Sequence, residues 1–190
     1  MKISSLLLCL SLLFLAGCTE VVGPTRQEDI LSDRIILIVS ERLNKKHGFR
    51  LSCIGGAADK EGVWEIAAGY GRYGTAILDI AEARELILDC AKEFLDEANH
   101  DEAFRPYMKV YPFTSTNLGL TIINYDESGR EIVFPYISTI GLHSGDIYYR
   151  SLDSDVMQPY ARIIEETYEE DVALSKKQQI HKVPDEGTQQ

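Results

Sequence analysis

The sequence predicts an α+β fold: a single domain with a mostly antiparallel sheet of about five strands, packed by three helices on one face in the order α-β-β-α-β-β-β-α. Turn residues at 59–62 and at 126–129 each separate two expected strands, which is typical of antiparallel hairpins. Stretches with helical spacing lie before, between and after these hairpins. No internal repeat or second-domain signal occurs, so we expect one domain.

The first helix is expected over residues 27–46. Glu28 and Asp29 favour the positive N-terminal end of a helix, and Gly48 is a stop signal. The centre reads Ile-Ile-Leu-Ile-Val and would also fit a strand. We interpret it as helix because charged residues flank it at helical spacing.

The first hairpin is expected to pair strands 49–57 and 63–73. Gly55 and Gly56 suggest a bulge or a close approach in the first strand. The side chains that alternate on one face of the second strand are Trp64, Ile66, Ala68 and Tyr70.

The second helix is expected to begin at Thr75 or Ala76 and to end near Asn99. Its apolar positions recur at steps of three and four: Ile80, Ala83, Ile87, Cys90, Phe94 and Ala98. Charged residues cover the remainder of its surface: Glu82, Glu85, Asp89, Lys92, Glu93 and Asp96.

The second half of the domain is expected to hold strands at 118–125, 131–140 and 147–150. Pro135 argues for an edge or a bulge. A last helix is expected from Ser154 or Asp155, with Pro159 in its first turn. Its apolar side steps by four, through Tyr160, Ile164, Tyr168 and Val172.

The N-terminus has the features of a secretion signal. Lys2 supplies a positive charge, residues 6–15 are mostly apolar, and the stretch ends in Leu15-Ala16-Gly17-Cys18. This ending resembles the lipobox of bacterial lipoproteins. The resemblance implies that the Cys18 thiol receives a diacylglyceryl thioether, that residues 1–17 are removed, and that the freed amine of Cys18 can be acylated too. The alternatives are an ordinary signal peptide with a chance cysteine, or a short anchor helix.

The resemblance also implies a domain organisation and a location. We expect a signal peptide at 1–17, a lipidated cysteine and flexible tether at 18–26, the α+β domain at 27–174 and a disordered tail at 175–190. Several acyl chains anchor a protein stably, so the expected location is the cell envelope. Thr19 stands where an Asp would favour inner-membrane retention, which favours the outer membrane in a Gram-negative source.

The charge balance argues against nucleic-acid binding. The chain holds 19 basic and 30 acidic residues, a net charge of −11, and removal of residues 1–17 takes away Lys2 and leaves −12. A net negative protein is repelled by phosphate backbones and anionic headgroups. We expect a membrane contact through the lipid, an envelope protein or glycan as partner, and no nucleic acid.

Cys53 and Cys90 remain in the domain after Cys9 and Cys18 are set aside. An exported compartment permits a disulfide between them, because Cys53 alternates with Phe49 and Leu51 and Cys90 lies on the apolar face of a helix. The alternative is two buried thiols that behave as small hydrophobes.

The sequence Gly-Tyr-Gly-Arg-Tyr-Gly, residues 69–74, matches G-x-G-x-x-G between an expected strand and an expected helix. The strand belongs to a hairpin rather than to a βαβ unit, and the acidic residue about 20 positions later would fall inside the helix. These departures argue against a dinucleotide site. A weak anion or nucleotide site formed by Arg72 and the helix N-terminus stays open.

Other chemistry is weakly indicated. His143 lies beside Ser144 and Asp146, and an envelope hydrolase with a non-local site that includes His143 is the enzymatic alternative. No metal-ligand spacing occurs, so we expect neither metal nor cofactor. The main expectation is a non-catalytic binding or structural role. Its expected contact surface is formed by Tyr70, Arg72, Tyr73, Tyr148 and Tyr149, although tyrosines also occur at the wet edges of a core.

Overall fold

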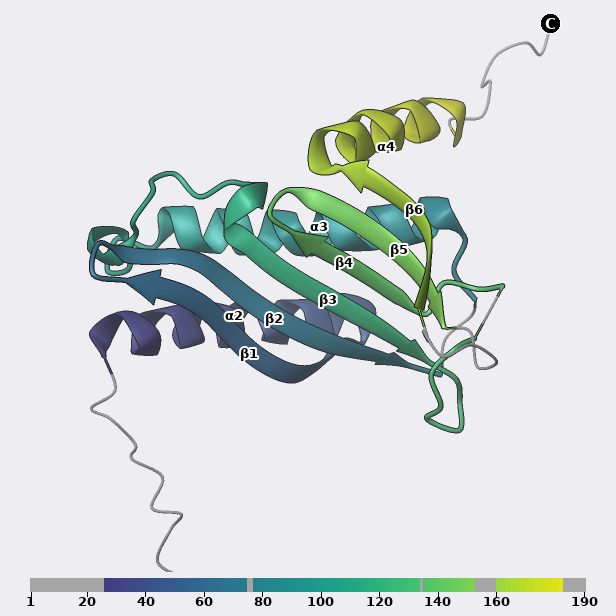
Figure 1. Ribbon diagram of the computed structural model, residues 1–190, viewed down its shortest axis with the longest axis horizontal. Coiled ribbons are helices and arrows are strands. Elements are labelled where there is room, and N and C mark those ends of the chain that lie inside the picture. The colour runs from purple at the N-terminus through teal and green to yellow at the C-terminus, as the bar shows by residue number, and fades with distance from the viewer. Residues whose placement is uncertain (1–25, 75–76, 134, 153–159, 183–190) are drawn as a thin grey trace, which may run out of the picture.

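The computed structural model describes residues 26–74, 77–133, 135–152 and 160–182, without the side chains of 160–163 and 179–182. It confirms an α+β domain with a mostly antiparallel sheet (Figure 1). The expected signal peptide, Cys18 and nearly all of the tether lie outside the described residues. The elements are α2 (Gln27–His47), β1 (Arg50–Asp59), β2 (Gly62–Tyr73), α3 (Ile80–His100), 3₁₀ turns at Arg105–Tyr107 and Ser115–Asn117, β3 (Leu118–Tyr125), β4 (Thr139–His143), β5 (Asp146–Leu152), β6 (Tyr160–Thr167) and α4 (Tyr168–Lys182).

The sheet has six strands in the order β1-β2-β3-β4-β5-β6. Each neighbouring pair is antiparallel except β2 and β3, which run parallel because α3 lies between them in the chain. The helices α2 and α3 cover one face of the sheet, and α4 follows β6 at one end (Figure 1). The other face carries no described helix and is called the open face below. None of the described helices combines the length and hydropathy that crossing a bilayer needs.

The core lies between the sheet and the helices α2 and α3. Strand β3 shows the principle: its side chains alternate between buried and partly exposed, and Leu118, Leu120 and Ile122 face the helices. Ile35 on α2 and Phe94 on α3 are also fully buried. Each such side chain contributes about 1.5–3 kcal/mol through burial.

Local sequence signals set the C-terminal end of α2 and the N-terminal start of α3. α2 ends at His47 and is capped by Gly48, whose φ of 71° is left-handed and whose N–H donates to the Asn44 carbonyl at 2.8 Å. α3 begins later than Thr75 or Ala76. Asp79 accepts from the Glu82 N–H, and the Glu82 carboxylate accepts from the Asp79 N–H, so this reciprocal cap fixes the start at Ile80.

The predicted alternation of Trp64 with Ile66 is wrong. Glu65 pairs with Ala57 whereas Val63 pairs with Ala58, so a bulge leaves Trp64 without a partner in β1. Trp64 is therefore 40% exposed, while Ile66 is buried.

The expected strand at 131–140 forms only in part. Glu131 makes an isolated bridge with Tyr125, and the regular strand β4 does not begin until Thr139. Pro135 lies in the interruption, where its lack of an N–H prevents it from continuing a ladder.

The expected last helix is wrong over residues 160–167, which form β6 paired with β5. A spacing of four fits one face of a helix, but four is also twice the strand period, so that pattern does not separate the two. The helix α4 begins at Tyr168, where the Glu170 N–H donates to the Thr167 hydroxyl and the Glu170 carboxylate accepts from the Thr167 N–H. It continues to Lys182, past Ser175, where the disordered tail was expected. Residues 153–159 and 183–190 lie outside the described part.

Candidate binding pocket

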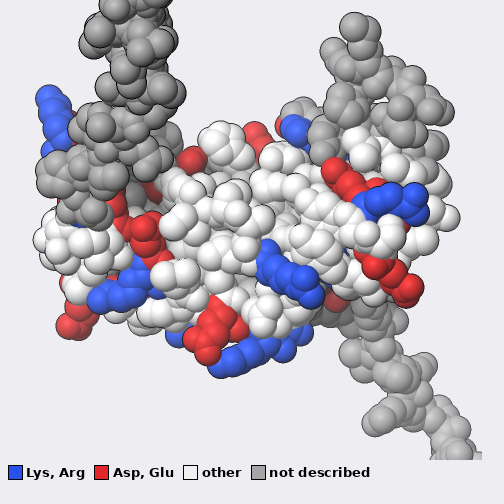
Figure 2. Space-filling view, turned by 90° about the horizontal axis from the view of Figure 1, so that it is seen from below, with Lys and Arg blue, Asp and Glu red and all other residues white. Residues whose placement is uncertain are grey.

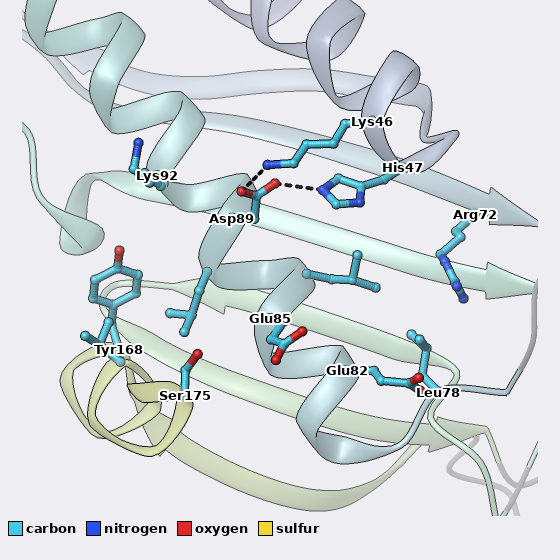
Figure 3. Close-up of a pocket in the computed structure, with 13 residues that line it drawn as sticks. Lys46, His47, Arg72, Leu78, Glu82, Glu85, Asp89, Lys92, Tyr168 and Ser175 are labelled. Carbon is cyan, nitrogen blue, oxygen red and sulfur yellow. Dashed lines mark hydrogen bonds and ion pairs between the residues drawn. The ribbon is translucent and has the colours of Figure 1, made fainter. Parts of the chain in front are cut away.

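A hollow lies over α3, between the C-terminal end of α2 and the helix α4 (Figure 3). Its cavity volume is about 680 Å³, which is within the range of small-molecule sites. Its apolar lining is Leu78, Leu86, Leu88, Tyr168 and Val172. Its charged lining is Lys46, Arg72, Glu82, Glu85, Asp89 and Lys92.

One wall of the pocket is formed by the charged side of α3, which lies opposite the apolar positions of that helix. Glu82, Glu85, Asp89 and Lys92 follow one another at steps of three and four, so they share one side of α3. Because α4 packs beside α3, this charged side becomes one wall of a pocket rather than an open surface (Figure 3). The sequence did not predict this wall, because residues 160–167 were expected to be helical and the position of α4 was therefore unknown.

Asp89 joins the first two helices at the rim of this pocket. Its carboxylate contacts Lys46 Nζ at 2.5 Å and His47 Nε2 at 2.7 Å (Figure 3). Partial burial alone would raise the pKa of Asp89, but the hydrogen bonds from His47 and Lys46 outweigh burial and lower this pKa. Asp89 is therefore ionised at neutral pH, and its charge is compensated within the protein.

Arg72 projects from the end of β2 toward the helix-covered side and lines the other end of the pocket (Figure 3). Partial burial lowers the pKa of its guanidinium, and the charge of Glu82 offsets part of that effect. The site therefore offers a guanidinium beside carboxylates, next to a strip of leucine side chains. Such a lining suits a ligand with an apolar body and polar groups of both signs.

The pocket does not assemble a catalytic group of side chains. His47 and Ser175 lie on opposite sides of α3, so the histidine is not poised to activate that hydroxyl (Figure 3). Within the described ranges, no group of three or more His, Cys, Asp or Glu residues could hold a metal ion. Among the described side chains, the lining combines apolar and charged groups of the kind that small-molecule sites use.

The expected contact surface is divided by the sheet. Tyr70 and Tyr149 are fully buried on the helix-covered side, where the Tyr70 hydroxyl lies 2.8 Å from the Ser40 hydroxyl. The prediction that Tyr70 and Tyr149 belong to a contact surface is wrong. Neighbouring strand positions point to opposite faces of the sheet, and these two residues point into the core. Tyr73 and Tyr148 lie on the open face, and Tyr73 stacks on Tyr125 with ring centroids 4.7 Å apart.

The possible disulfide is not formed, because Cys53 and Cys90 are both free; the alternative of two buried thiols holds for Cys90 only. Cys53 is exposed on the open face over Gly69, whereas Cys90 is buried in the core. A register shift between Leu51 and Cys53 breaks the alternation that was expected to turn Cys53 inward. The sheet therefore separates the two thiols.

The glycines of the 69–74 motif have structural roles. A Cβ on Gly69 would meet the Cys53 sulfur, and one on Gly71 would meet the Tyr73 ring, so both glycines accommodate side chains that lie flat on the open face. Gly74 has a left-handed φ of 63°. The N-terminus of α3 is already capped by the Asp79 carboxylate, which disfavours a second anion there.

His143 lies at the end of β4 and is 63% exposed. Its Nδ1 is 3.6 Å from Glu65 Oε2, beyond hydrogen-bond distance, and this buried carboxylate oxygen has no hydrogen-bond partner among the described residues. Ser144 has a φ of 53° because it turns the chain between β4 and β5. The described geometry therefore places this histidine near a carboxylate, at a distance too long for a hydrogen bond.

Comparison with known proteins gave no relative: no family model, curated protein or solved structure matches the chain.

Proposed function

We propose that this chain is a bacterial lipoprotein, anchored in the cell envelope through Cys18, whose α+β domain has a non-catalytic binding role. The proposed anchor is supported by the sequence Leu15-Ala16-Gly17-Cys18. It follows a positively charged N-terminal residue, Lys2, and an apolar stretch of signal-peptide length. A tether of eight residues, 19–26, would span at most about 29 Å, so the domain would work close to the membrane surface.

The pocket over α3 supports the binding role. It combines a cavity of about 680 Å³ with an apolar strip and charged groups that are partly held in place by contacts such as Asp89 with Lys46. Preorganised polar groups beside apolar surface are what small-molecule sites share. We propose that an envelope-located amphiphile or the side chain of an envelope protein enters this pocket.

The anchor is tested by expressing the full chain with its own N-terminus and comparing it with Cys18→Ser. The lipidated protein is expected in the detergent phase of a cloud-point extraction and in the membrane fraction, and Cys18→Ser in neither. Equal partitioning of the two proteins would refute the anchor. The pocket is tested separately by Leu86→Arg, which fills it with a charge, in binding assays with detergent-like and fatty-acid probes.

The enzymatic alternative draws less support. Cleavage through His143 needs a nucleophile at hydrogen-bond distance, and the ion-pair partner described for its side chain is the carboxylate of Glu65. The anion site at Gly69–Gly74 is likewise disfavoured by the Asp79 carboxylate at the start of α3.

A further inference from the structure

We propose that the free edge of β1 receives an extended, basic segment of a partner protein, which adds to the sheet as a further strand. This inference goes beyond the proposed function, because none of the described residues of β1 lines the pocket over α3. The partner is defined by its chemistry: a backbone able to form a β-ladder, with at least one Lys or Arg side chain directed toward α2.

The strand β1 lies at one edge of the described sheet. It pairs with β2 on one side, and no other described strand pairs with its second side. In a strand of ten residues, about half of the backbone N–H and C=O groups then point away from the sheet. The opposite edge, β6, differs because it leads directly into α4 and packs against it (Figure 1).

Edge strands are usually protected by charges or proline, and β1 has little of either. Arg50 and Asp59 stand at its two ends, and the eight residues between them are uncharged and include no proline. Ile54 in this stretch is 46% exposed, and Gly55 and Gly56 present no side chain to an approaching backbone. Figure 2 shows the molecule from below the view of Figure 1, with a broad uncharged area among scattered charged side chains.

A small acidic pocket adjoins the same stretch of β1. Its volume is about 210 Å³, and Asp29 and Asp33 from the first turns of α2 line it together with Gly55 and Gly56. A strand added beside β1 would place alternate side chains on the α2 side of the sheet. A Lys or Arg at such a position would meet these carboxylates, which gives the proposed partner its charge.

Charge also argues against a second copy of this chain as the occupant. Antiparallel pairing of β1 with itself about a two-fold axis at the centre of the strand would bring Asp29 and Asp33 of both copies toward that axis. Like charges at an interface oppose association, and each mature chain would carry a net charge of −12. A basic strand from a different protein would be attracted to these carboxylates instead of being repelled. Such a strand therefore suits the edge of β1 better than a second copy of this chain.

The test uses the purified full chain and two nine-residue peptides, one alternating lysine with valine and one alternating glutamate with valine. The lysine peptide is expected to bind at least tenfold more tightly in calorimetry and to slow deuterium exchange of the β1 amides. The proposal predicts that Asp29→Asn with Asp33→Asn weakens binding at least fivefold. Ile54→Lys, which places a charge on the edge, is expected to weaken it similarly.

The matched control is Glu127→Gln with Glu169→Gln, which removes the same charge from exposed positions that do not line the small acidic pocket. If both double variants weaken binding equally, the attraction is nonspecific and the proposal fails. It also fails if the two peptides bind equally, or if bound lysine peptide leaves β1 exchange unchanged. If sedimentation shows that the chain is a dimer and that Ile54→Lys dissociates it, the edge of β1 is occupied by a second copy of the chain, and the proposal fails. None of these outcomes bears on lipidation of Cys18, which is measured independently.

Discussion

Arg84 of α3 and Asp171 of α4, 87 positions apart in the chain, form a buried ion pair with Arg84 Nε 2.8 Å from Asp171 Oδ1. The two residues are 3% and 0% exposed. The same guanidinium donates to both Glu166 carboxylate oxygens, at 2.7 and 3.0 Å, and the Tyr149 hydroxyl donates to Asp171. This cluster fastens α4 to α3 and to the sheet, and so it places the α4 wall of the pocket.

Arg84→Met is expected to destabilise the domain by about 3–5 kcal/mol, because it leaves the carboxylates of Asp171 and Glu166 buried without their cation. Urea unfolding followed by circular dichroism measures the change. The control is Arg34→Met, since Arg34 pairs with Asp101 at the surface and its loss should cost about 1 kcal/mol or less. Similar costs for the two variants would show that the cluster does not hold α4.

The buried carboxyl of Asp171 is expected to make stability depend on pH. Burial raises the pKa of Asp171 to about 6, and the hydrogen bond with Glu166 adds to this rise. The folded state then binds this proton more tightly than the unfolded state, so the contribution of Asp171 is fully present below pH of about 4 and is lost as the pH rises through 6. Glu166 acts in the opposite direction, because its pKa is lowered.

The variant Asp171→Asn isolates this contribution. Wild-type melting temperature, measured relative to that of Asp171→Asn, should fall between pH 4 and pH 7. A difference that stays constant or rises across this interval would mean that Asp171 is ionised throughout.

The boundary between β6 and α4 depends on Thr167 and Glu170. Removing the hydroxyl in Thr167→Ala is expected to cost about 1 kcal/mol, because the Glu170 N–H loses its acceptor. Thr167→Ser keeps the oxygen and should cost little. Chemical denaturation of both variants gives the comparison, and equal stability of the Ala and Ser variants would contradict the cap.

The two thiols of the domain should differ in reactivity. Cys53 is exposed and is expected to react with a chromogenic disulfide reagent in the folded protein, whereas Cys90 should react only after unfolding. Burial raises the pKa of the Cys90 thiol, which further suppresses its thiolate. Detecting no reactive thiol in the unfolded, unreduced domain would indicate the disulfide that the structure lacks.

Much of the fold follows from local patterns in the sequence. The helix α2 and the first hairpin are predicted because charged flanks, alternation and turn residues agree there. The errors occur where a pattern fits two structures or where a bulge shifts the register. The four-residue spacing from Tyr160 suits a strand as well as a helix, and the bulges at Ser52 and Trp64 reverse the faces that simple alternation assigns. The Thr167–Glu170 capping signature was visible and would have placed the start of α4 correctly.

The pocket was less accessible to prediction than the fold. Its charged wall on α3 reads as a solvated helix face, and only the packing of α4 through Arg84 and Asp171 encloses it. These two residues are 87 positions apart, and no local pattern relates them. Tyr70 and Tyr149 were misassigned for a related reason, because a count of tyrosines does not say which face of the sheet each one occupies.

The central claim is the anchor at Cys18, and intact-mass analysis of the protein extracted from membranes tests it most directly. The account predicts a chain that begins at Cys18 and carries the added mass of a diacylglyceryl group, with or without a further acyl chain on the amine. A protein that keeps Met1 to Gly17, or one that begins at Cys18 with an unmodified thiol, would contradict it.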